Sequence, residues 1–336
     1  MARSRFVPDN FTLALVVVVT LASLLPAHGQ GAWFFEHLTA FAIGLLFFLH
    51  GAKLSREAIL RGIAHWRLHL LVFACTFALF PVLGLVLRPV LAPLVTPELY
   101  TGVLYLCVLP ATVQSAIAFT SLARGNIAAA VCSASASTML GVLVTPILVN
   151  AIVLPSGSAS TSFDAIGKIV VELVLPFVAG HLLRPWIGAW LHRRAPMVRF
   201  VDQGSILLVV YSAFSAAVIE GLWKQVPVSA LAGLLVLCAV LLTVALGSTT
   251  WLARRLGFDK EDEITIVFCG SKKSLASGIP MAKVLFASGA VGAIVLPLLL
   301  FHQMQLMVCA VLAQRYARRP QATPPDKTAA PARRSA

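Results

Sequence analysis

Two adjacent lysines, Lys272 and Lys273, lie in the middle of an apolar segment that is long enough to cross a bilayer. A charge at that depth costs roughly 2.5 kcal/mol or more, so such residues tend to mark substrate or ion pathways. A fixed positive charge can attract an anion, and a buried amine can bind and release a proton. The alternative is that both lysines reach the membrane surface from an ordinary helix end. Because apolar sequence continues on both sides, we expect the buried position.

Small and helix-breaking residues surround the two lysines: Gly270, Ser271, Ser274, Ser277, Gly278 and Pro280. This composition predicts a helix that stops and restarts, with its freed backbone groups lining a wet cavity. We therefore expect a substrate or ion site formed by Gly270, Ser271, Lys272, Lys273 and Ser274.

A related pattern occurs 159 residues earlier, where residues 115–124 align without a gap on residues 274–283. The breaker run Leu109-Pro110-Ala111-Thr112 precedes the first of these stretches, as Gly270-Ser271 precedes the second. Five predicted spans separate the two, so they cross the membrane in opposite directions. Interrupted helices at matching positions of two inverted halves are typical of transport sites.

A third polar region lies just after the first stretch, where Ser133, Ser135, Ser137 and Thr138 occupy one apolar segment. Ser133 and Ser137 are four residues apart and share a helix face, so both are candidates to face the break at Pro110. Close helix packing by small residues is the alternative. His65 and His69 are expected in or beside a basic loop.

The elements that position these residues follow from composition. The chain has 336 residues, of which 59% are hydrophobic and 12% charged, about half the charged fraction of a soluble domain. Apolar runs of membrane-spanning length recur throughout and predict a polytopic, all-α membrane protein. We expect ten spans, near residues 11–27, 32–52, 68–91, 98–122, 127–152, 167–190, 201–221, 227–252, 263–287 and 291–314.

The ten spans are predicted to form a transporter domain over residues 11–315, with inverted repeats at about 11–152 and 167–315. Residues 1–10 are then a short cytoplasmic N-terminus. A cleaved signal peptide is the alternative for the first span, because Arg3 and Arg5 precede its apolar run. The proline-rich, basic tail 316–336 is expected to be disordered and cytoplasmic.

The net charge of +13 does not indicate a nucleic-acid partner, because the basic residues lie in short loops between spans. With the N-terminus inside, most of the 26 lysines and arginines fall on the inner side. This bias predicts an even number of spans with both ends cytoplasmic. Membrane lipid is the expected surrounding, and the location is a bacterial inner membrane.

Catalytic chemistry and cofactors are not expected. The six cysteines lie singly inside apolar segments, so neither a disulfide frame nor a metal site is predicted. An enzyme would need a nucleophile with a base, or a cluster of histidines and carboxylates, and the sequence offers neither. No P-loop accompanies the spans, which argues against ATP-driven transport by this chain.

These motifs resemble those of the bile acid:sodium symporter superfamily. The similarity is greatest to the SBF-like subgroup that contains the seventh member of the human bile-acid carrier family and its bacterial homologues. It covers roughly residues 10–315 and rests on Phe47–Ser55, Leu122–Asn126 and, most specifically, Cys269–Pro280.

The resemblance implies a panel domain (first, second, sixth and seventh helices) and a core domain in which the broken fourth and ninth helices cross. Family members often couple organic-anion uptake to Na⁺, with ligands on the fourth, fifth and ninth helices. Carried over by position, Thr112, Gln114 and Ser115 fall at the fourth-helix break. Ser133 and Ser137 lie near the fifth-helix ligands, although Ala130 and Ala134 align more closely with the hydroxyl positions.

The ninth helix departs from the sodium-dependent members. Phe268 falls at or near their acidic sodium ligand, and Lys272 near their neutral amide. A lysine ammonium would then stand where those members hold a bound cation. The overall hypothesis is a secondary transporter of a small organic anion that works by alternating access, coupled to Na⁺, to H⁺ or to no ion. The alternative is a non-transporting membrane regulator of calcium homeostasis, which relatives in this subgroup suggest.

Overall fold

The computed structural model describes residues 10–53, 65–153, 170–219, 221–286 and 291–319, and within them every regular element is helical. The first half contains α1 (Asn10–Leu24), α2 (Gly29–Lys53), α4 (Trp66–Ala74), η2 (Cys75–Leu79), α5 (Phe80–Val86), α6 (Arg88–Leu91), η3 (Ala92–Leu94), α7 (Pro97–Val108), α8 (Val113–Leu122), α9 (Ile127–Leu148) and η4 (Val149–Val153). The second half contains η5 (Val170–Val174), α11 (Leu175–Arg193), α12 (Ala195–Ile219), α13 (Leu222–Gln225), α14 (Val228–Arg255), α15 (Lys260–Gly270), α16 (Leu275–Leu285) and α17 (Val291–Ala317).

Seven helices in the described part of the chain are long and apolar enough to cross a membrane, and α7 with α8, bent by 64°, would make an eighth. The helix α1 is apolar but shorter, and α15 and α16 are separated by a break. The prediction of an all-helical, multi-span protein is therefore confirmed, whereas ten spans and two inverted repeats stay predictions. Residues 1–9, the start of the second predicted repeat (167–169) and the tail from 320 lie outside the described residues.

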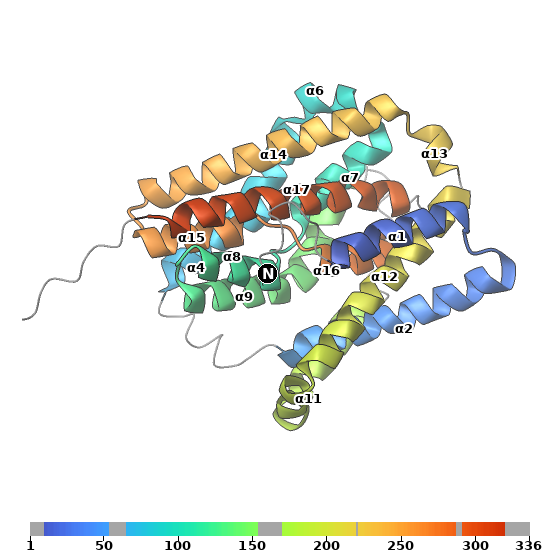
Figure 1. Cartoon of the computed structure of the whole chain (residues 1–336), viewed down its shortest axis with the longest axis horizontal. Coiled ribbons are helices and arrows are strands. Elements are labelled where there is room, and N and C mark those ends of the chain that lie inside the picture. Colours follow the sequence, from blue (N-terminus) through green and yellow to red (C-terminus); the bar gives the residue numbers. More distant parts are fainter. Residues whose placement is uncertain (1–9, 54–64, 154–169, 220, 287–290, 320–336) are drawn as a thin grey trace, which may run out of the picture.

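The helices pack in two groups (Figure 1). In one group α2 packs along α11 and α12, and α1 packs on α12. In the other, α17 contacts α7, α8, α14 and α16, while α15 contacts α4, α8, α9 and α14. The helix α12 contacts both α16 and α17 and so connects the two groups.

The contact between α2 and α11 depends on two glycines. A Cβ at Gly51 would lie 1.9 Å from the carbonyl oxygen of Phe177, and one at Gly180 would lie 1.9 Å from the carbonyl oxygen of Phe48. The two backbones can approach this closely only because neither position carries a side chain.

Gly51→Ala is therefore expected to push the helices apart and to lower the free energy of unfolding by about 1–3 kcal/mol, the usual effect of overpacking. The measurement is the melting temperature of the purified protein in detergent. The matched control is Gly204→Ala on α12, where a Cβ would meet nothing within 4 Å. Equal melting temperatures for the two variants would contradict the close contact.

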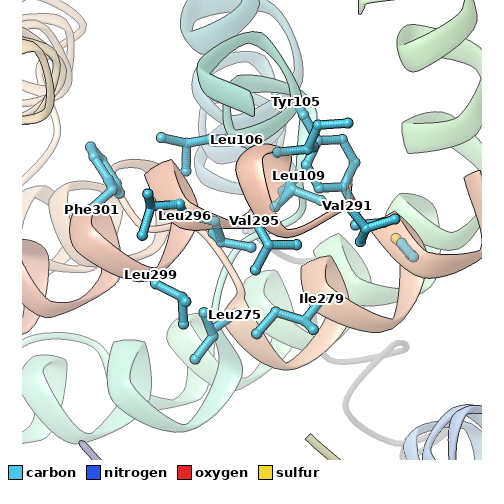
Figure 2. Packing of buried hydrophobic residues seen from close by; sticks show 14 of the residues in the cluster. Tyr105, Leu106, Leu109, Leu275, Ile279, Val291, Val295, Leu296, Leu299 and Phe301 are labelled. Atoms are coloured by element: carbon cyan, nitrogen blue, oxygen red, sulfur yellow. The ribbon is translucent and has the colours of Figure 1, made fainter. Parts of the chain in front are cut away.

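Apolar packing also holds the two helix breaks in place. Figure 2 shows side chains from α7, α16 and α17 interlocked around Leu109, which lies just after the end of α7. A Cβ at Gly278 would come within 2.5 Å of a Leu109 methyl group. Buried hydrophobic contacts thus help to fix the broken segments, with contributions from Tyr105, Leu106, Leu275, Ile279, Val291, Val295, Leu296, Leu299 and Phe301.

Candidate functional site

Two helices are interrupted, and their interruptions touch. The break between α7 and α8 spans residues 109–112, and the break between α15 and α16 spans residues 271–274. The backbone N–H of Ser274 donates to the carbonyl of Pro110 at 2.9 Å, and the Thr112 hydroxyl donates to the carbonyl of Lys273 at 2.8 Å. We call this contact between residues 109–112 and 271–274 the crossing.

Local sequence explains why each helix stops at the crossing. Pro110 lacks an N–H and disfavours helical geometry at the preceding residue, so α7 ends at Val108. In the second break Ser271 donates its hydroxyl to the carbonyl of Val267, at the end of α15. Ser274 then starts α16 as an N-cap, its hydroxyl accepting from the N–H of Ser277 at 3.2 Å. The serines predicted as site residues here therefore shape the break.

Side chains from neighbouring helices satisfy backbone groups that the breaks leave free. The Ser137 hydroxyl on α9 accepts from the N–H of Ala111 at 3.0 Å, and the Thr145 hydroxyl donates to the carbonyl of Val108 at 2.9 Å. Each such bond removes the cost of a buried, unpaired backbone group. Ser137 therefore contacts the crossing, as the sequence suggests.

The largest contribution comes from Gln305 on α17, which sequence reasoning missed. Its Oε1 accepts from the N–H of Lys273 at 3.1 Å, and its Nε2 donates to the carbonyl of Lys273 at 3.0 Å. The same Nε2 lies 2.8 Å from Nδ1 of His302, one turn earlier. The sequence signal was the polar group His302-Gln303-Gln305 inside an otherwise apolar helix.

The two lysines are both fully buried, but their ammonium groups have different surroundings. Lys273 Nζ donates to three backbone carbonyls, those of Thr76, Cys107 and Leu109, at 2.7, 2.8 and 2.8 Å. It also lies 4.2 Å from the ring centroid of Phe80. This ammonium has its full complement of hydrogen bonds.

Lys272 Nζ, by contrast, has no hydrogen-bond partner among the described residues. It lies 3.8 Å from the ring centroid of Phe119 on α8 and 5.9 Å from that of Phe268 on α15. Contacts with aromatic faces stabilise a cation by about 2 kcal/mol when it is desolvated, well below the cost of burying an unpaired charge. Lys272 Nζ therefore has aromatic contacts but no hydrogen-bond acceptor in the described chain to offset its burial.

The helix α8 lies beside Lys272 at Phe119. The Ser115 hydroxyl is buried without a hydrogen-bond partner in the described chain, and it shares a helix face with Phe119, one turn later. Gln114 is exposed, and Thr112 is half-buried and bonded to the second break. Lys272 Nζ and the Ser115 hydroxyl are thus both buried without hydrogen-bond partners among the described residues, the first against Phe119 and the second one helical turn before it.

Ser133 does not lie at the crossing. Its hydroxyl is 2.6 Å from Nδ1 of His69, which is buried in the first turn of α4. Gly270, the last residue of α15, packs against the start of η2, because a Cβ there would lie 3.1 Å from that of Cys75. These two positions support the helices around the crossing.

A polar junction ties the α8–α9 turn to the start of α15. Asn126 caps α9 by accepting from the N–H of Ala129 at 3.0 Å, and its amide donates to Asp262 at 2.9 Å. Its backbone N–H donates to the carbonyl of Glu261 at 3.2 Å, and its own carbonyl accepts from the Thr265 hydroxyl at 3.1 Å. This one side chain and its backbone therefore hold α9 and α15 together.

Asn126→Ala removes both the cap and the bond to Asp262, so we expect a loss of about 1–2 kcal/mol in stability. The measurement is the detergent melting temperature, with the exposed Asn150→Ala as the control on the same segment. An unchanged melting temperature for Asn126→Ala would show that the junction contributes nothing.

Among the described residues, no group of three or more histidine, cysteine or acidic side chains could hold a metal ion. All six cysteines are buried and unpaired with one another.

The long apolar helices define a polytopic membrane protein. The chain belongs to the SBF-like CPA transporter family, whose model matches residues 9–318. It is 69% identical over 319 residues to an uncharacterized protein of Pseudomonas aeruginosa, covering 95% of this chain and 96% of that one. It is 58% identical over 310 residues to YfeH of Escherichia coli (strain K12), named as a proposed symporter, with 92% and 93% coverage.

A mammalian protein is similar over the same length. The sodium/bile acid cotransporter 7 of Mus musculus is 30% identical over 309 residues, which are 90% of each chain. The family resemblance read from the sequence is thereby confirmed, and membership places the chain among membrane transporters rather than enzymes.

Proposed function

We propose that the protein is a secondary transporter that carries a small organic anion by alternating access, with Na⁺, H⁺ or no ion coupled to the movement of the anion. The observation that carries the proposal is the crossing. Two interrupted helices meet there by a direct backbone hydrogen bond, beside a buried ammonium that has no hydrogen-bond partner in the described chain. Interrupted helices that meet around a charge are the usual site architecture of secondary transporters.

The proposal includes ten helices in two inverted five-helix halves, about 11–152 and 167–315. One break lies in each half, at residues 109–112 and 271–274. The packing of α1, α2, α11 and α12 in one group and of the broken helices in the other supports a division into panel and core. In this account the core moves against the panel and exposes the crossing to each side in turn.

The substrate contact is assigned to Lys272. An anion beside it would pair the ammonium and accept from the Ser115 hydroxyl, which also has no partner in the described residues. The helices α8 and α16 both begin at the crossing, so the positive ends of their dipoles favour negative charge there. The full proposed substrate and ion site comprises Thr112, Gln114, Ser115, Ser133, Ser137, Gly270, Ser271, Lys272, Lys273 and Ser274, of which Ser133 and Gly270 act through packing.

The location follows from charge and from the relatives. We propose a bacterial inner membrane with both chain ends cytoplasmic, because most basic residues then lie on the inner side. Anionic lipid is the expected neighbour of these loops. Nucleic acid is not an expected partner, and no resident cofactor is required.

Counterflow in proteoliposomes tests the proposal. Vesicles containing purified protein are loaded with one unlabelled organic anion from a screen that includes taurocholate and small carboxylates, and uptake of the labelled anion is followed with and without Na⁺ or pH gradients. At least one anion is expected to show protein-dependent counterflow. Absence of counterflow across the screen, together with altered calcium influx in cells, would favour the regulator instead.

A further inference from the structure

Three carbonyl oxygens converge on one point next to the crossing, and each has lost its usual helical donor. In η2 the N–H of Phe80 bonds to Cys75 rather than to Thr76, and the next residue, Pro81, has no N–H to donate. The N–H of Ala111, four residues after Cys107, donates to Ser137. The third carbonyl, that of Leu109, lies beyond the end of α7.

These oxygens form the type of site that binds a monovalent cation. Backbone carbonyls replace the hydration shell of such ions in proteins that select them, and the face of Phe80 adds a further attraction for positive charge. The ammonium of Lys273 occupies the point at 2.7–2.8 Å from all three oxygens, which is the short distance of charge-assisted bonds.

We infer that Lys273 is a tethered cation: its ammonium permanently fills a monovalent-cation site made by the carbonyls of Thr76, Cys107 and Leu109, so this site needs no dissociable ion. The positive charge also neutralises the negative C-terminal end of α7. Lys272 has no such acceptors among the described residues, so we assign the two neighbouring lysines different roles. The inference concerns ion binding and does not depend on any substrate being transported.

The test is chemical replacement of the tethered charge. Lys273→Ala empties the site but keeps the three carbonyls, so a free small cation can enter. Melting temperatures of the purified variant are measured without substrate in choline, sodium, potassium, ammonium and methylammonium chlorides at equal ionic strength. We expect a low value in choline and a saturable rise of about 3 °C or more with at least one small cation.

Three controls define the result. The wild type is expected to show no such rise, because the Lys273 ammonium already fills the site. Lys272→Ala is expected to show none either, because Lys272 Nζ has no acceptors among the described residues that a free cation could use. Lys273→Met, which fills the site with an uncharged chain, is expected to be less stable than the wild type and insensitive to the salt.

Equal melting temperatures of Lys273→Ala in all five salts would overturn the inference, as would an equal rise in the wild type. Failure to recover folded Lys273→Ala protein from cells and buffers supplied with methylammonium would do the same, because the inference requires that a free cation can replace the amine. Since no readout is transport, a negative counterflow screen leaves this test intact.

Discussion

Replacing Lys272 with Met is expected to abolish anion counterflow while the protein stays folded. The substitution keeps most of the side-chain volume beside Phe119 and removes the ammonium. Losing one partner of a buried charge pair costs roughly 2–5 kcal/mol, so the affinity for an anion should fall on the order of 10²-fold or more. Counterflow rates and melting temperature are measured on the same preparation.

The melting temperature separates this role from a structural one. Because the ammonium has no hydrogen-bond partner among the described residues, its removal should leave stability unchanged or raise it. Lys283→Met, a change of the same kind on α16 outside the crossing, serves as the control and should transport normally. Counterflow at the wild-type rate from Lys272→Met would refute the assignment of the anion contact.

Gln305→Leu is expected to be the most destabilising of the substitutions considered for the crossing. It leaves both the N–H and the carbonyl of Lys273 without the Gln305 side chain, and each buried backbone group that loses its partner costs about 1–3 kcal/mol. The Thr112 hydroxyl still donates to that carbonyl. We therefore expect a loss of about 2–4 kcal/mol, read as a fall in melting temperature or in the yield of folded protein.

Gln305→Glu is the informative companion, because a carboxylate can still accept from the N–H of Lys273 but cannot donate to its carbonyl. An intermediate stability is expected. Gln314→Leu, on the same helix but away from the crossing, should have little effect. If Gln305→Leu were as stable as Gln314→Leu, the bonds to Lys273 would have no structural role.

The interruption of the helix around Lys272 could be predicted because charge is costly in an apolar segment and the neighbouring residues break helices. The different surroundings of the Lys272 and Lys273 amines could not be predicted. Residues 271–274 are not helical, so the directions of adjacent side chains depend on partners from η2, α7 and α8. Those partners include three backbone carbonyls, and the position of a backbone carbonyl cannot be predicted from residue type. The proline at position 81 was the one available signal.

The serines of α9 show a different limit. Ser133 and Ser137 do share a face, as their spacing predicts, but one turn of helix places them about 6 Å apart along the axis. Because of that distance, the Ser137 hydroxyl bonds to the backbone of Ala111, whereas the Ser133 hydroxyl bonds to the side chain of His69. Sequence periodicity predicts which face of a helix a residue occupies. Which groups the residue meets at its position along the helix axis depends on how the neighbouring helices pack.

Two-sided accessibility at the crossing tests alternating access most directly. Gln114 is exposed in the first turn of α8, and its replacement by Cys, in a background without the six native cysteines, gives one reactive thiol. A membrane-impermeant thiol reagent is expected to label this thiol from either face of oriented membrane vesicles. Labelling from one face only, under every gradient and anion applied, would contradict transport through the crossing.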